Sequence, residues 1–120
     1  MNHKELEVWK KSVALVSLIY HVTDSFPDNE KFGITTQMRR AAVSIPSDIA
    51  EGAARNRDKE LVHFLYISLG SVAEVETLLT ISSELKFLNQ TILKEIISNL
   101  EEIKKMLLGL INYLKKKHRT

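Results

Sequence analysis

The stretch that decides the fold reads QMRRAAVSIPSDIAEG, from Gln37 to Gly52. Its apolar residues recur at steps of three and four, the spacing of one buried face of an α-helix. Pro46 lies inside this pattern, where it removes a backbone donor and crowds the preceding turn. We therefore predict a helix kinked at Pro46, preceded by Thr35 as its N-cap and ending near Arg55. Its predicted buried face comprises Met38, Ala42, Ile45, Ile49 and Ala53.

A first helix is predicted before this stretch, and it ends at the pair Phe26-Pro27. Proline cannot continue a helix, so the chain turns there. The predicted inner face is formed by apolar residues at steps of three and four. These are Leu6, Trp9, Val13, Val16 and Tyr20, with Leu15, Ile19 and Val22 widening the face.

Two long helices are predicted after it. The third runs from Asp58, its predicted cap, to about Lys86, and it is apolar around much of its circumference, which predicts burial on two sides. Small residues between Ser68 and Ala73 would let another backbone come close. Asn89 is predicted to cap the fourth helix. That helix has a coiled-coil-like seam of Leu93, Ile96, Leu100, Ile103, Leu107, Leu110 and Leu114.

The predicted connections are short, near residues 27–34, 56–57 and 87–90. Short connections make consecutive helices antiparallel neighbours. No stretch has the alternating pattern of a strand. The sequence therefore predicts one domain, residues 1–120, that is all-α and folds as an antiparallel up-down-up-down four-helix bundle.

The composition excludes several classes of function. There is no cysteine, so disulfides, thiolate metal sites and cysteine nucleophiles are absent. Hydrophobic residues make up 44% and charged residues 27%, as in ordinary globular proteins. No uninterrupted apolar run reaches the roughly 20 residues that span a bilayer, and the first residues do not form a secretory signal. We expect a cytoplasmic protein without a membrane partner.

Catalytic chemistry has few candidates. Glu60 and His63 are three residues apart, which is half of the site that di-iron bundle proteins build, but such proteins need a second pair and two further glutamates. No hydroxyl-histidine arrangement or glycine-rich phosphate loop is found. We expect no enzyme, no metal and no cofactor.

Charge is unevenly distributed although the formal net charge is only +2. Residues 103–120 hold six Lys and Arg and no acid. The last of these, Lys115, Lys116, Lys117 and Arg119, are candidates for phosphate contacts. Cations in a last turn also complement the helix dipole, so both interpretations stay open.

A second set of charges lies within the central helices. Antiparallel packing of the second and third helices could bring Arg39 and Arg40 near Glu51 and Glu74. One interpretation is an ion-pair network within the chain. The other is that the arginines reach a phosphate or a neighbouring subunit, for which the planar guanidinium is well suited.

The chain resembles the four-helix-bundle proteins encoded in intervening sequences of bacterial 23S ribosomal RNA genes. The resemblance runs nearly end to end, with Asp48 where the family usually has Asn. It is carried by LEVWK from Leu6, by Phe26-Pro27 and Glu30, by TTQMRRAAVSIPSDIAEG from Thr35, by Phe64-Leu65, Gly70-Ser71 and Glu74, and by MLLGLI from Met106.

Such proteins are similar to the accessory variability proteins of diversity-generating retroelements. The resemblance implies a homopentamer with a basic surface that binds RNA or DNA and, in retroelements, a reverse transcriptase. It also implies a shared surface or interface formed by Arg39, Arg40, Glu51, Gly52, Ser71 and Glu74. We therefore expect a non-enzymatic, oligomeric, nucleic-acid-associated accessory or scaffold protein. The alternative is a protein-protein interaction module that binds no nucleic acid.

Overall fold

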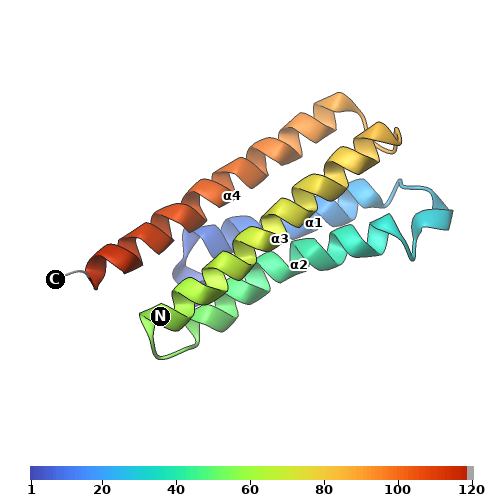
Figure 1. Ribbon diagram of the computed structural model, residues 1–120. Coiled ribbons are helices and arrows are strands. Elements are labelled where there is room, and N and C mark those ends of the chain that lie inside the picture. Colours follow the sequence, from blue (N-terminus) through green and yellow to red (C-terminus); the bar gives the residue numbers. More distant parts are fainter. Residues whose placement is uncertain (119–120) are drawn as a thin grey trace.

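Four long helices pack side by side in the computed structural model, which describes residues 1–118 (Figure 1). Consecutive helices are antiparallel neighbours, and α4 also contacts α1, which closes the bundle. The described residues contain no strand. The predicted all-α up-down-up-down architecture is therefore confirmed. The helices are α1 (Glu7–Thr23), α2 (Ile34–Ala53), α3 (Asp58–Glu84) and α4 (Gln90–Lys117), with short 3-10 turns η1 (His3–Glu5) and η2 (Asp28–Glu30).

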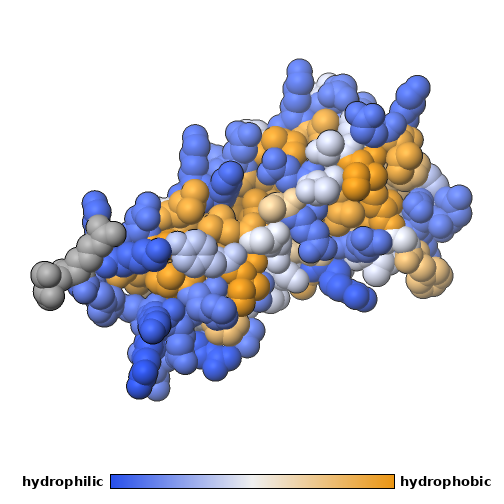
Figure 2. All heavy atoms as spheres, viewed as in Figure 1, coloured by the Kyte–Doolittle hydropathy of each residue, from blue (hydrophilic) through white to orange (hydrophobic). Residues whose placement is uncertain are grey.

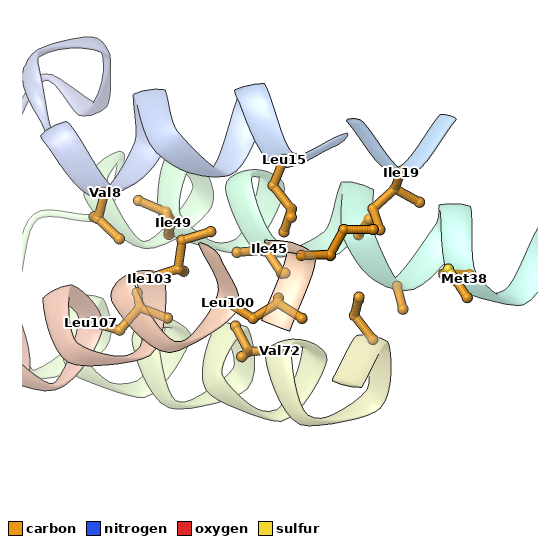
Figure 3. Packing of buried hydrophobic residues seen from close by; sticks show 14 of the residues in the cluster. Val8, Leu15, Ile19, Met38, Ile45, Ile49, Val72, Leu100, Ile103 and Leu107 are labelled. Atoms are coloured by element: carbon orange, nitrogen blue, oxygen red, sulfur yellow. The ribbon is translucent and has the colours of Figure 1, made fainter. Parts of the chain in front are cut away.

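The core is a single apolar cluster to which all four helices contribute (Figure 3). Every residue of the predicted inner face of α2 is buried, from Met38 to Ala53. The seam of α4 is also confirmed for the most part, with one shift: Ile111 is buried where Leu110 was expected, and Leu110 is half-buried. Steps of three and four therefore gave the correct register for α2 and nearly all of α4.

The predicted inner face of α1 is confirmed for Leu15, Ile19 and Val22, which are buried, and wrong for two other residues. Val13 and Tyr20 are 40% and 44% exposed. The buried stripe passes through Ser12 instead, whose hydroxyl donates to the Val8 carbonyl at 2.6 Å. Because Ser12 is polar, apolar spacing does not predict that it is buried. A hydroxyl that makes a hydrogen bond is nevertheless tolerated in a core. The buried residues are Val8, Ser12, Leu15, Ile19, Val22 and Thr23.

Two of the predicted helix caps are also wrong. Gly33, not Thr35, is the N-cap of α2, and Thr35 lies buried in the first turn. Arg57 precedes α3, and Asp58 is its first helical residue. The cap of α4 is confirmed, since Asn89 Oδ1 accepts from the Ile92 amide at 2.8 Å.

Pro46 lies buried within α2, which runs without interruption from Ile34 to Ala53. The kink at Pro46 stays a prediction. One residue before the proline, the Ile45 carbonyl accepts a hydrogen bond from Ser68 Oγ of α3 at 3.0 Å. This buried bond fixes α3 against the middle of α2.

By length and composition alone, helix α3 could cross a membrane, since an 18-residue stretch of it has a mean hydropathy of 1.4. This is weak evidence, because a core helix passes the same test. One face of α3 packs against α2 and α4, whereas Ile67 and Ile81 are 41% and 43% exposed. The small residue that meets another helix closely is Gly52 of α2, since a Cβ there would lie 2.7 Å from Phe64 Cβ. Gly70 faces open space.

Candidate functional site

The two adjacent arginines of α2 have different surroundings. Arg39 is bound to the end of α1: its Nε donates to Thr23 Oγ1 at 2.9 Å and its Nη2 to the Tyr20 carbonyl at 3.3 Å. The guanidinium lies 4.5 Å from the centre of the Tyr20 ring, and Asp24 is 3.7 Å away. A cation at a helix C-terminus complements the helix dipole. Arg39 therefore joins α1 to α2.

Arg40 is exposed and lines a shallow groove of about 510 Å³ between α1 and α2. Three aliphatic hydroxyl groups lie along the same groove, but Thr36 and Ser44 already donate to the carbonyls of Lys31 and Arg40. Among the described residues Ser47 makes no such bond, and its hydroxyl can donate to a phosphate oxygen. The exposed methyl groups of Val43 add an apolar element. The lining residues are Tyr20, Thr36, Arg39, Arg40, Val43, Ser44, Ser47 and Asp48.

One acid shares this groove. Burial raises the pKa of the Asp48 carboxyl, and the nearby Glu51 carboxylate raises it further. The local environment thus disfavours a negative charge at Asp48.

The predicted network of Arg39 or Arg40 with Glu51 or Glu74 is not formed among the described residues. Arg39 turns toward α1, and Glu51 pairs with Arg55 one turn later, at 3.2 Å. Arg39 therefore contacts α1, whereas the prediction placed its partners on α2 and α3. Glu74 is exposed on α3.

The other two residues of the expected shared surface differ in exposure. Gly52 is buried in the contact of α2 with α3, and Ser71 is half-buried. Gly52 therefore belongs to an interface within the chain.

The basic end of α4 lies against the start of α3 (Figure 1). Lys117 and His118 contact the Asp58 carboxylate at 3.3 and 2.8 Å, and Lys115 Nζ donates to the Tyr66 hydroxyl at 2.9 Å. The pKa of the Asp58 carboxyl is lowered mainly by its hydrogen bond with His118 and further by the neighbouring Lys117. Lys116 is exposed. Arg119 lies outside the described residues.

These basic groups do not form one patch. Arg40 is in the second turn of α2, whereas the end of α4 lies near the α2–α3 connection, at the opposite end of α2 (Figure 1). The thirteen residues of α2 that follow Arg40 correspond to roughly 20 Å of helix. A ligand that contacts both must span that length.

The metal half-site considered in the sequence does not gain partners. Within residues 1–118, no group of three or more His, Asp or Glu residues could hold a metal ion. Glu60 and His63 are both exposed, and the His63 ring packs edge-on against Phe64.

The surface also carries apolar side chains. Hydrophobic patches interrupt the charged surface on the face shown in Figure 2. Among the large hydrophobic residues exposed on α3 and α4 are Tyr66, Ile67, Ile81, Leu108 and Tyr113.

The described residues form a small all-helical bundle in which Arg39 and Arg40 line a groove between α1 and α2, and they contain no group of acids and histidines that could hold a metal ion. The chain belongs to the family of 23S rRNA-intervening sequence proteins, because the sequence model of that family matches residues 4–109. The resemblance noted in the sequence is thereby confirmed.

A solved structure shares this fold. It is the crystal structure of a protein of unknown function from the S23 ribosomal protein family of Bacteroides thetaiotaomicron VPI-5482, with a TM-score of 0.78. The two sequences are 22% identical, and the alignment covers 87% of this chain and 97% of that chain. At this identity the likeness shows the fold alone. The chain has no match among curated proteins.

Proposed function

We propose that this protein is a non-enzymatic, oligomeric accessory protein of the cytoplasm that binds RNA or DNA through the groove between α1 and α2. The observation that carries the proposal is the exposed Arg40 beside Arg39, in a groove that also holds the hydroxyl of Ser47. Guanidinium and hydroxyl groups are the side chains that contact nucleic-acid phosphates.

Assembly is the second part of the proposal. The exposed apolar residues of α1, α3 and α4 would be covered in an oligomer, and the resemblance to retroelement accessory proteins favours five subunits. A ring multiplies each basic group, so that weak contacts from single chains add up through multivalency. Lys115, Lys116, Lys117 and Arg119 would reinforce Arg40, although Lys115 and Lys117 already have partners on α3.

A competing proposal is a protein-protein interaction module. It is favoured by the exposed apolar residues of α3, Tyr66, Ile67 and Ile81. The resemblance suggests a reverse transcriptase as one such partner. In this case the basic residues would contribute to solubility only.

The test is a gel-shift titration of the intact protein at 50 mM salt with a labelled RNA stem-loop, a single-stranded RNA and a duplex DNA. We expect Arg40→Ala to weaken binding, while the control Lys94→Ala, an exposed cation of α4, has little effect. Removal of residues 115–120 should weaken binding less than Arg40→Ala. If the tail deletion alone matters, the site is misplaced. If the intact protein binds neither RNA nor DNA, the interaction module takes first place.

A further inference from the structure

Phe32, in the connection between α1 and α2, has the highest exposure of the large hydrophobic residues among residues 1–118. It is 90% exposed, whereas the next, Met1, is 60% exposed. The connection forms one tip of the bundle, where η2 leads into α2 (Figure 1). Single apolar residues are common on protein surfaces, so exposure alone does not assign a ligand, whereas the surroundings of this ring do.

Hydrogen bonds hold the backbone on both sides of Phe32. The amides of Lys31 and Gly33 donate to carbonyls of η2 at 3.1 and 2.9 Å. The Lys31 carbonyl in turn accepts from the Thr36 hydroxyl of α2. The ring is therefore presented by a fixed turn, and a contact with it requires little ordering of the chain.

The turn is continuous with the groove of Arg40. Thr36, which bonds to Lys31, also lines that groove, about one turn of helix before Arg40. The helix rises roughly 10 Å over the residues that follow Gly33, up to Arg40. One short strand of nucleic acid can therefore contact both Phe32 and Arg40.

The charge of this turn indicates which part of a nucleic acid would lie against the ring. Residues 27–33 carry two acids, Asp28 and Glu30, and one cation, Lys31. The turn itself therefore does not attract phosphate, whereas an uncharged nucleobase can lie on it. Lys31 Nζ is 5.8 Å from the ring centre, within the range of a cation–π contact, and most of the ring stays accessible. The phosphates of the same strand would lie toward Arg40.

We propose that Phe32 stacks on an unpaired base of a single-stranded nucleic acid whose backbone lies in the groove of Arg40. The stacking rests on the proposed nucleic-acid function and narrows its ligand to single strands. An aromatic ring stacks on the face of any base, so the contact requires an unstacked segment but no particular sequence. A duplex hides the faces of its bases and gains nothing from Phe32.

The experiment is a fluorescence-anisotropy titration of the intact protein with two labelled RNA strands of about 12 nucleotides, at about 50 mM salt. One strand carries bases, and the other has the same backbone with an abasic ribose at every position. Phe32→Ala should weaken binding of the strand with bases about fivefold or more, and leave binding of the abasic strand and of a duplex RNA unchanged. Arg40→Ala should weaken binding of both strands, because both contain phosphates. The control is Leu85→Ala, which removes another exposed apolar side chain from a helix connection.

A second readout detects the base at the ring directly. Phe32→Trp keeps an aromatic face and should retain the affinity of the natural protein. Its indole fluorescence should change when the strand with bases is added and not when the abasic strand is added. The natural protein, whose only tryptophan is Trp9 of α1, should show no such difference. Phe32→Leu keeps an apolar side chain without a ring and should lose affinity as Phe32→Ala does.

The stacking is overturned if Phe32→Ala or Phe32→Leu binds the strand with bases as tightly as the natural protein does, or if Phe32→Ala weakens binding of the abasic strand equally. It is also overturned if Phe32→Ala lowers the mass found by light scattering, because a second copy of the chain would then cover the ring. In each of these cases, binding that still depends on Arg40 leaves the proposed function standing. If the intact protein binds neither strand and no duplex, the proposed function fails, and the stacking fails with it.

Discussion

The Nε of Arg39 donates to Thr23 Oγ1 at 2.9 Å, which ties the first turns of α2 to the last turn of α1. This bond separates the roles of two adjacent arginines. Arg39→Ala removes two hydrogen bonds and the stacking on Tyr20, so we expect a loss of about 1–3 kcal/mol in the free energy of unfolding. Arg40→Ala should change it by less than about 0.5 kcal/mol. Urea denaturation of both variants measures this, and equal losses would contradict the assignment.

Two helical glycines should respond to alanine with opposite signs. At Gly52 a new Cβ would lie 2.7 Å from Phe64 Cβ and 3.3 Å from the Leu61 carbonyl oxygen. Gly52→Ala should therefore destabilise the protein by about 1–3 kcal/mol, since α3 must move away from α2. Gly70→Ala adds a methyl group in open space and should stabilise the protein by up to about 1 kcal/mol. Denaturant titration of the pair is the measurement; two changes of the same sign would be inconsistent with the close approach at Gly52.

Asp48 should make stability depend on pH in a defined direction. Its pKa is raised in the folded protein, first by burial and then by Glu51. Folding therefore disfavours the ionised Asp48 carboxylate, which lowers the stability of the folded protein. This loss of stability is complete above the folded-state pKa and disappears as the pH falls below the unfolded-state pKa. Asp48→Asn should raise the melting temperature at pH 7, and this advantage should shrink toward pH 3. Glu95→Gln, on the exposed side of α4, serves as the control. An advantage for Asn that grows on acidification would show that the sign is wrong.

Assembly can be measured directly. We expect size exclusion coupled to light scattering to give about five times the chain mass of 13.7 kDa. The expectation rests on the exposed apolar residues of α1, α3 and α4 and on the family resemblance. Ile67→Glu, which places a charge on the exposed side of α3, should reduce the mass, and Lys94→Glu should not. A monomer that persists at tens of micromolar would rule out the ring.

The sequence predicted the four helices well, and it predicted the registers of α2 and α4, because their apolar residues follow a single spacing. The inner face of α1 was predicted correctly at Leu15, Ile19 and Val22 but not at Val13 and Tyr20. That helix carries two adjacent stripes of suitable spacing, and the one that is buried contains Ser12. Only packing against α2 and α4 decides between them.

The candidate site was predictable in its residues but not in their contacts. The pair Arg39-Arg40 is evident in the sequence, yet the partners of Arg39 lie in the last turn and the C-cap of α1, 15 to 19 residues earlier. The contact of Lys117 and His118 with Asp58 follows from antiparallel packing, which places the end of α4 beside the start of α3. The buried hydroxyl of Thr35 had no signal in the sequence, because the same residue type is common as a helix cap.

The salt dependence of RNA binding tests the central claim most directly. Each phosphate contact contributes about 0.7 to the slope of log affinity against log salt for single strands. For the natural protein we predict a slope that corresponds to several phosphate contacts. The slope of Arg40→Ala should be shallower than that of Lys94→Ala, by about 0.7 for every chain whose Arg40 contacts the RNA. An affinity that does not change with salt, or a slope that is the same in both variants, would contradict nucleic-acid binding at this groove.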